Sequence, residues 1–252
     1  MAPNRIVALK VLKASLSRNR ALIERFRREA ELAARISHPN VVRIYEAGED
    51  QGRYYISMEY VDGASLLRVL RLADAQSPFP ERRALEIVLQ IASGLKAAHA
   101  AGIIHGDVKP GNILIASDGS AKLSDLGMAA EVLADGDALT LGGTPKYAAP
   151  EQLLRNGRAD ARSDIYALGA TLFEMLAGTP LRRPHDSLDA EGRMHNVEGI
   201  LLTFNPRISP AVAQIVDRMT APAPPDRFED CDGLIAALAA VEPAQDAVGH
   251  PT

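Results

Sequence analysis

The chain opens with two short patterns of apolar residues that differ in period. Residues 6–13 read IVALKVLK, and Ala8, Lys10 and Leu12 share one face at the two-residue period of a β-strand. Residues 19–36 are highly charged and repeat their apolar positions at intervals of three and four, which is typical of an amphipathic helix. The apolar stripe of this helix consists of Ile23, Phe26, Ala30 and Ala33. The sequence therefore predicts a strand followed by a helix.

Two more strand-like runs follow this helix before the pattern changes. They cover residues 41–47 and 53–61 and are separated by a polar turn that contains a glycine. Helical patterns dominate after Asp62-Gly63, and the clearest of them begins at Pro80 and ends near Gly102. The buried face expected for this helix consists of Ala84, Val88, Ile91, Leu95 and Ala98. Further helices are expected at 163–177, from Pro210 to about residue 219, and at 232–241. A small piece with strands thus precedes a larger helical piece, and clefts between such pieces are common ligand sites.

Composition and charge narrow the classes of protein that the chain can represent. Its 252 residues carry a formal net charge of −4, which argues against nucleic acid or a membrane surface as the partner. Cys231 is the single cysteine, so the chain can form no internal disulfide or thiolate metal cluster, and a reducing, cytoplasmic location is expected. The sequence shows no apolar signal segment and no run of apolar residues long enough to span a membrane.

The residues with the clearest chemistry lie in the middle of the chain. The segment 105–112 reads HGDVKPGN, in which Asp107 and Asn112 have the spacing D-x-x-x-x-N. Asp125 lies thirteen positions after Asn112. In phosphoryl transfer one such aspartate accepts a hydroxyl proton, while an asparagine and a second aspartate hold Mg²⁺ on the nucleotide phosphates. Hard oxygen ligands suit Mg²⁺, and Lys109 could neutralise charge on the transferred group. The spacing therefore favours a phosphotransferase.

Together with several other segments, these motifs resemble a eukaryotic-type protein kinase domain in the style of the bacterial serine/threonine kinases. The segments are VALK at 7–10, FRREAELAARISHPNVV at 26–42, YYISMEYVDG at 54–63, GTPKYAAPE at 143–151, DIYALG at 164–169 and DRF at 226–228. The resemblance implies an α+β, two-lobed fold with a reduced N-terminal β-lobe of about three strands and one helix. It places this truncated N-lobe at 1–61, a mainly helical C-lobe with the catalytic loop and activation segment at 62–242, and a polar tail at 243–252.

The resemblance also implies which residues carry out ATP-dependent protein phosphorylation. Asp107 would be the catalytic base, and Lys109 would steady the transferred phosphoryl group. Asn112 and Asp125 would bind Mg²⁺. Thr144 resembles the threonine that contacts the catalytic aspartate in serine/threonine kinases. The expected partner is therefore a protein substrate with a serine or threonine acceptor.

A second set of residues would hold the nucleotide if the resemblance is correct. Lys10 would bind the α- and β-phosphates, with Glu29 as its charge partner. The backbone of Glu59 and Val61 would read adenine, because the segment that contains them resembles the hinge. The complete set implied for ATP is Lys10, Glu29, Ala8, Glu59, Val61 and Leu114. A structural ion pair between Arg227 and Glu151 is also implied.

Three features depart from the family pattern. The glycine-rich loop G-x-G-x-x-G is absent, because the loop and its two strands need about 15 residues, and only five residues precede Ile6. The sequence is therefore expected to be N-terminally truncated, through a misplaced start codon, as a fragment or as a shortened relative. Gly106 stands where the family has an arginine that pairs with a phosphorylated activation segment, which predicts weak control by that route. Leu126 replaces a phenylalanine in an apolar packing role.

Two alternatives to a protein kinase stay open at this point. A non-catalytic, kinase-like module that binds or regulates a partner is favoured by the absence of the glycine-rich loop. It is disfavoured by the intact set of Asp107, Lys109, Asn112 and Asp125. A small-molecule kinase of related fold is a weaker alternative, because the segment 143–151 resembles a platform for protein substrates.

Overall fold

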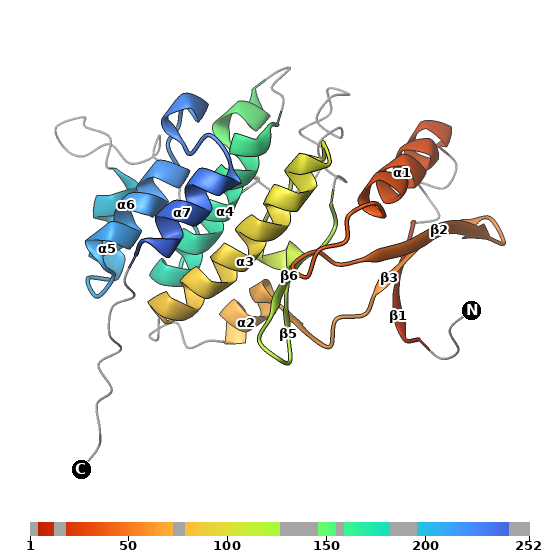
Figure 1. The fold of residues 1–252 in the computed structure, drawn as a ribbon, viewed down its shortest axis with the longest axis horizontal. Helices are drawn as coiled ribbons and strands as arrows, with labels where there is room; N and C mark the ends of the chain where they lie inside the picture. Colours follow the sequence, from red (N-terminus) through yellow and green to blue (C-terminus); the bar gives the residue numbers. More distant parts are fainter. Residues whose placement is uncertain are drawn as a thin grey trace, which may run out of the picture.

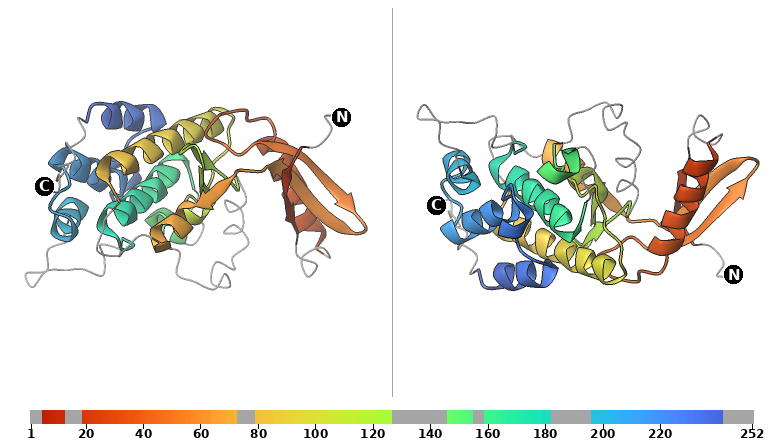
Figure 2. Two further views of the ribbon diagram at one scale, coloured as in Figure 1. Left: turned by 90° about the horizontal axis from the view of Figure 1, so that it is seen from below. Right: turned by 90° about the horizontal axis from the view of Figure 1, so that it is seen from above.

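A small group with a sheet and one helix adjoins a larger, mostly helical group (Figure 1). The computed structural model describes residues 5–12, 19–72, 79–126, 146–154, 159–181 and 196–241. Figure 2 shows from two further directions that the first sheet and α1 lie at one end of the molecule and α5, α6 and α7 at the other. β5 (Ile113–Ala116) and β6 (Ala121–Leu123) lie between these ends (Figure 1).

The first sheet has three antiparallel strands in the order β1-β3-β2. Its strands are β1 (Val7–Val11), β2 (Ile44–Asp50) and β3 (Arg53–Glu59). Helix α1, Arg20–Ala33, packs against this sheet with the stripe that its sequence predicts. Phe26 and Ala30 of the helix are buried and form a small core with Ile56 of β3. The predicted strand at 6–13, the helix at 19–36 and the strand at 53–61 are thus confirmed in type and approximate position.

β1 alternates between its two faces, as the period of its sequence predicts. Val7, Leu9 and Val11 are exposed, whereas Ala8 and Lys10 are half-buried. β1 pairs with β3 on one side and is the edge strand of the described sheet. Lys10 therefore lies on the inner face of the sheet, toward α1 and the helical group.

The predicted strand at 41–47 was wrong at its start, because Val41 and Val42 pair outside the first sheet. The Val42 N–H donates to the Leu123 carbonyl over 2.9 Å, and the Leu123 N–H donates to the Asn40 carbonyl over 2.8 Å. The Asn40 side-chain amide also donates to the Ala121 carbonyl over 2.9 Å. This segment therefore ties the small group to a strand of the helical group, and β2 begins only at Ile44.

The larger group surrounds a second, short sheet with helices. That sheet has the order β4-β5-β6 and contains β4 (Gly63–Ser65), β5 (Ile113–Ala116) and β6 (Ala121–Leu123). The helices are α2 (Leu66–Leu72), α3 (Glu81–Ala100), α4 (Ala161–Ala177), α5 (Val197–Phe204), α6 (Pro210–Met219) and α7 (Cys231–Ala239). The sequence predicts α3, α4, α6 and α7 closely, but does not single out α2 and α5.

Buried apolar residues explain why the predicted helices form where they do. The face predicted for α3 is completely buried and consists of Ala84, Val88, Ile91, Leu95 and Ala98. α4 is buried around nearly its whole circumference, in keeping with its almost uninterrupted apolar sequence. Asp160 caps its N-terminus by accepting the N–H groups of Arg162 and Ser163, and Gly178 ends it with a left-handed φ of 70°.

No helix of the described part of the chain is both long enough and apolar enough to cross a membrane. The chain leaves the first sheet after Glu59 and enters the second at Gly63. The division into lobes at residues 61 and 62 stays a prediction, and the tail at 243–252 lies outside the described residues.

Candidate active site

Three of the predicted catalytic and metal-binding residues meet in the loop between α3 and β5. Lys109 Nζ lies 2.5 Å from Asp107 Oδ2, and Asn112 Nδ2 lies 3.0 Å from the same oxygen. Asn112 Nδ2 also donates to the Asp107 carbonyl over 2.9 Å. Because the amide nitrogen of Asn112 faces Asp107, its amide oxygen is the end that can ligate a cation. The short 3-10 helix Pro110–Asn112 closes the loop and sets this geometry.

A buried carboxylate on α4 holds the start of this loop. Asp164 has a side chain that is only 1% exposed. Its oxygens accept the backbone N–H of His105 over 2.9 Å and the N–H of Gly106 over 2.8 Å. His99 of α3 lies 2.8 Å from Asp164 through Nε2. Charge-assisted hydrogen bonds of this kind are stronger than neutral ones, so Asp164 anchors the loop to the helical core.

His105 links the same loop to the segment that carries Asp125. Its ring is fully buried, and Nδ1 accepts the Asp107 N–H over 3.1 Å. The proton of the neutral ring therefore lies on Nε2, which donates to the Ser124 carbonyl over 2.9 Å. Ser124 in turn donates its N–H and its hydroxyl to the Asn112 carbonyl over 2.9 Å and 3.0 Å. These bonds keep the two predicted metal ligands, Asn112 and Asp125, in neighbouring positions.

Lys10 and Asp125 form an ion pair although 115 positions separate them in the sequence. Lys10 comes from β1, and Asp125 follows β6 in a left-handed backbone conformation with φ of 61°. Both side chains are about one-third exposed. The structure therefore brings the lysine predicted for the phosphates into contact with an aspartate predicted for Mg²⁺. Glu29 lies in α1, but its side chain is outside the described part of the structure, so its pairing with Lys10 stays a prediction.

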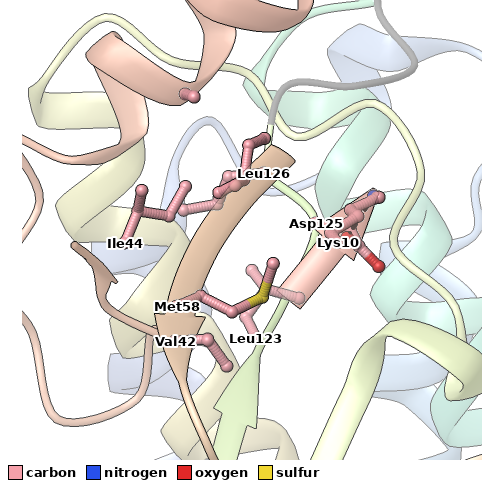
Figure 3. A pocket seen from close by; sticks show the side chains of 9 residues that line it. Lys10, Val42, Ile44, Met58, Leu123, Asp125 and Leu126 are labelled. Carbon is pink, nitrogen blue, oxygen red and sulfur yellow. Dashed lines mark hydrogen bonds and ion pairs between the residues drawn. The ribbon is translucent and has the colours of Figure 1, made fainter. Parts of the chain in front are cut away.

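An apolar pocket lies beside the Lys10–Asp125 pair (Figure 3). The other residues of its wall are Ala30, Val42, Ile44, Ile56, Met58, Leu123 and Leu126. Its volume of about 20 Å³ is close to that of a single water position. Leu126 is 5% exposed and thus occupies the apolar packing position that its sequence context implies. This wall shields one side of the ion pair from water and strengthens its electrostatic interactions.

The remaining residues predicted for the nucleotide come from both groups. Ala8, Val61 and Leu114 are half-buried. The Glu59 carboxylate lies 2.9 Å from Lys122 Nζ, and the Glu59 N–H donates to the Arg43 carbonyl over 2.8 Å. The side chain of Glu59 is thus engaged away from the predicted nucleotide, which agrees with a role for its backbone only. Gly127 and Thr144 lie outside the described residues.

The structure contains the implied ion pair between Glu151 and Arg227. The guanidinium nitrogens lie 2.7 Å and 2.8 Å from the two carboxylate oxygens. Burial alone would raise the pKa of Glu151, but hydrogen bonds from Arg227, from its own backbone and from Ser163 lower this pKa overall. This pair joins the end of the segment 146–154 to the segment before α7, and it lies apart from Asp107.

Sequence reasoning did not assign a role to two polar residues that contact the loop. Asp164 was visible only as part of the DIYALG motif, and its position in an otherwise apolar helix was the available signal. Gln152 is 3% exposed and donates through Nε2 to the Gly106 carbonyl over 3.0 Å. No spacing or pattern in the sequence pointed to Gln152, because its partner is a backbone carbonyl 46 positions away.

The thiol of Cys231 is expected to resist thiol–disulfide exchange in the folded protein. Its pKa is raised to about 12, first by burial and then by the neighbouring carboxylates of Asp164, Asp230 and Asp232. The thiol therefore stays protonated near pH 8, and it lies 3.7 Å from His99 Nδ1. We expect an aromatic disulfide reagent at pH 8 to leave Cys231 unmodified in the folded protein. When urea is added, the rate of modification should equal the rate of unfolding. Complete reaction within minutes in the absence of denaturant would contradict this expectation.

Comparison with known proteins gives a consistent result over almost the whole chain. The sequence model of the family described as "Protein kinase domain" matches residues 1–242. The probable serine/threonine-protein kinase PknB of Lactococcus lactis is 36% identical over 241 residues, which are 94% of this chain and 38% of that protein. The serine/threonine-protein kinase PrkC of Bacillus subtilis is 37% identical over 237 residues, which are 92% of this chain and 36% of that protein. The chain thus spans little more than a third of the length of these relatives.

A solved structure agrees with the sequence comparisons. The crystal structure of the PknI kinase domain of Mycobacterium tuberculosis superimposes with a TM-score of 0.70 at 31% sequence identity. The match covers 92% of this chain and 84% of that domain. The two-lobed α+β fold predicted from the motifs is therefore confirmed by the overall architecture.

Proposed function

Because the chain belongs to the protein kinase domain family, we propose that it transfers the γ-phosphoryl group of ATP to a serine or threonine hydroxyl of a protein. The observation that carries this proposal is the joint contact of Asp107 Oδ2 with Lys109 Nζ at 2.5 Å and Asn112 Nδ2 at 3.0 Å. A carboxylate, an ammonium group and an amide oxygen are thereby assembled at one point of the loop. Phosphoryl transfer depends on such positioning and on charge stabilisation more than on covalent chemistry of the protein.

In the proposed reaction, each residue acts on a defined atom. Asp107 orients the acceptor hydroxyl and takes its proton, while the acceptor oxygen bonds to the γ-phosphorus and the bond to the ADP oxygen breaks. Lys109 neutralises negative charge on the moving phosphoryl group, and Lys10 binds the α- and β-phosphates. Each of the two lysines is held by a carboxylate, Lys109 by Asp107 and Lys10 by Asp125.

The side chains present fit Mg²⁺ as the cofactor. The amide oxygen of Asn112 and the carboxylate of Asp125 are hard oxygen donors, and Ser124 keeps the two residues adjacent. When bound, Mg²⁺ supplies neutralising charge on the phosphates. Lys10 and Asp125 form an ion pair. The proposed phosphate-binding lysine and one proposed Mg²⁺ ligand are therefore neighbours.

The substrate, the partners and the cellular location of the protein are also part of the proposal. The relatives named above are longer than this chain, so the activity, substrates and location of the whole protein are proposals. We propose a protein substrate, no nucleic-acid partner and a cytoplasmic location, on the grounds of the acidic net charge and the single buried cysteine. A non-catalytic, kinase-like binding module is the alternative.

Binding of ATP and Mg²⁺ is expected to be mutually dependent, which a thermal unfolding experiment can measure. At ligand concentrations of about 100 times Kd, the expected stabilisation is about 2.7 kcal/mol, which raises Tm by about 5–10 °C for a chain of this size. ATP with EDTA, or Mg²⁺ alone, should produce a much smaller shift. Asp125→Ala should reduce the combined shift, because it removes one proposed metal ligand.

The matched control is Asp118→Ala, which changes an exposed turn carboxylate and should leave the combined shift intact. A wild-type protein without a Tm shift at millimolar Mg²⁺ and ATP would argue against the proposed nucleotide site. A normal shift without phosphotransfer to a generic protein acceptor would favour the binding-module alternative.

A further inference from the structure

Gly106 is the residue directly before the proposed base, and hydrogen bonds hold its peptide groups from opposite sides. Its N–H donates to Asp164 Oδ1 over 2.8 Å, and its carbonyl accepts from Gln152 Nε2 over 3.0 Å. The backbone of Gly106 is left-handed, with φ of 73°. Glycine has more backbone freedom than any other residue, so these two bonds restrict a position that is otherwise mobile. The position of Asp107 depends directly on the orientation of this carbonyl.

Both ends of the Gln152 side chain are fixed in one orientation. Its Oε1 accepts the Ala149 N–H over 2.9 Å, while Nε2 donates to Gly106. Gln152 belongs to the 3-10 helix Pro150–Leu153 and directly follows Glu151, which Arg227 binds through both carboxylate oxygens. The side chain is 3% exposed, so water cannot readily replace either bond. Gln152 therefore transmits the fixed position of this helix to the loop.

We propose that Gln152 is a positioning residue for Asp107 and acts through the carbonyl of Gly106. This inference rests on the proposed phosphotransfer function. Gly106 has no side chain with which to bind a phosphate. Its contacts with other parts of the protein are therefore made by its backbone N–H and carbonyl groups. Gln152 gives that support from the 3-10 helix, and Asp164 gives it from α4. Gln152 and Asp164 thereby fix the backbone on the N-terminal side of Asp107.

The central test is Gln152→Met, which keeps an unbranched side chain of similar volume but removes the donor and the acceptor. We expect kcat for a protein or peptide acceptor to fall by about 10- to 100-fold, because small displacements of a catalytic group have effects of this size. The KM for ATP should stay within about twofold of the wild-type value, since the hydrogen bonds of the Gln152 side chain join Ala149 and Gly106, neither of which is assigned to ATP. Gln152→Glu should lower kcat at least as much, because it places a carboxylate against the Gly106 carbonyl.

Gln90→Met is the matched control for a general loss of stability. Gln90 Oε1 accepts the Ala121 N–H over 2.8 Å and the Asn40 amide over 3.1 Å, and neither partner belongs to the loop. We expect Gln90→Met to lower Tm about as much as Gln152→Met does, without the loss of kcat. Equal losses of kcat in both variants, or a kcat within twofold of wild type in Gln152→Met, would overturn the proposal.

Hydrogen exchange separates this inference from the proposed function. In the wild-type protein, the Asp107 N–H is bonded to His105 Nδ1 and the Gly106 N–H to Asp164. Loss of the Gln152 bond should raise the exchange rates of both amides by about fivefold, as expected for one buried hydrogen bond. If the wild-type protein transfers no phosphate but exchange rises in Gln152→Met, only the proposed function fails. If exchange of both amides is unchanged, the positioning role is wrong whatever the activity.

Discussion

Asp107→Asn is expected to remove nearly all phosphotransfer while the protein stays folded. Asparagine has almost the same shape as aspartate, but its amide cannot take the proton of the acceptor hydroxyl. Loss of general-base catalysis lowers kcat by a factor of about 10²–10⁴. Lys109 also loses the carboxylate that lies 2.5 Å from its Nζ, so its position over the transferred group becomes less defined. Measurement of kcat with a purified variant and a generic protein acceptor tests both effects together.

Asp118→Asn is the control for this variant. Asp118 is an exposed turn residue that accepts the Ser120 N–H over 2.8 Å, and it lies outside the proposed site. We expect its activity to stay within twofold of wild type and its Tm to stay within a few degrees. Because the Asp107 side chain is 39% exposed, Asp107→Asn should also unfold at nearly the wild-type temperature. More than about a tenth of the wild-type kcat in Asp107→Asn would contradict the role of Asp107 as the base.

The pattern of apolar residues predicts most of the local structure because burial follows it closely. The five residues predicted to line the inner face of α3 are completely buried, and β1 alternates between half-buried and exposed positions. The start of β2 was not predictable in the same way. Val41 and Val42 are suitable strand residues, but they bond to Leu123 of another sheet. Strand propensity identifies an extended segment but contains no information on its partner.

The candidate site follows the same distinction between local and distant contacts. Asp107, Lys109 and Asn112 lie within six consecutive positions, so their spacing in one loop predicts that they meet. The contact between Lys10 and Asp125 joins residues 115 positions apart and forms only in the folded protein. The sequence motifs identify the two residues but do not predict that they touch. Gln152 escapes sequence reasoning because it acts on a carbonyl group, which every residue possesses. Side-chain chemistry is visible in a sequence, whereas backbone groups that receive a specific bond are not.

Arg227→Met is expected to destabilise the protein strongly although it spares the proposed catalytic residues. The Arg227 side chain is completely buried. It donates to the carbonyls of Ala221 and Pro222 over 2.8 Å and 3.0 Å, and it lies over the Tyr166 ring at 4.8 Å. Methionine fills much of the same volume, but it leaves the Glu151 carboxylate, whose side chain is only 17% exposed, without its cation. Loss of one partner of a buried pair costs about 3–5 kcal/mol, which corresponds to a Tm lower by about 10 °C for this chain length.

The pH dependence of this loss distinguishes the ion pair from simple packing. In the wild-type protein the pKa of Glu151 is lowered on folding, so its contribution is present above the unfolded-state pKa and is lost as pH falls through the folded-state pKa. In Arg227→Met, only the backbone and Ser163 hydrogen bonds oppose the effect of burial, so the pKa of Glu151 should be higher than in the wild-type protein. The difference in Tm between the two proteins should therefore be largest at pH 7 and should shrink toward pH 4. The double variant Glu151→Gln/Arg227→Met should recover part of the lost Tm at pH 7, because it removes the unpaired charge. A Tm difference that is the same at both pH values would show that the loss comes from packing and from the carbonyl bonds alone.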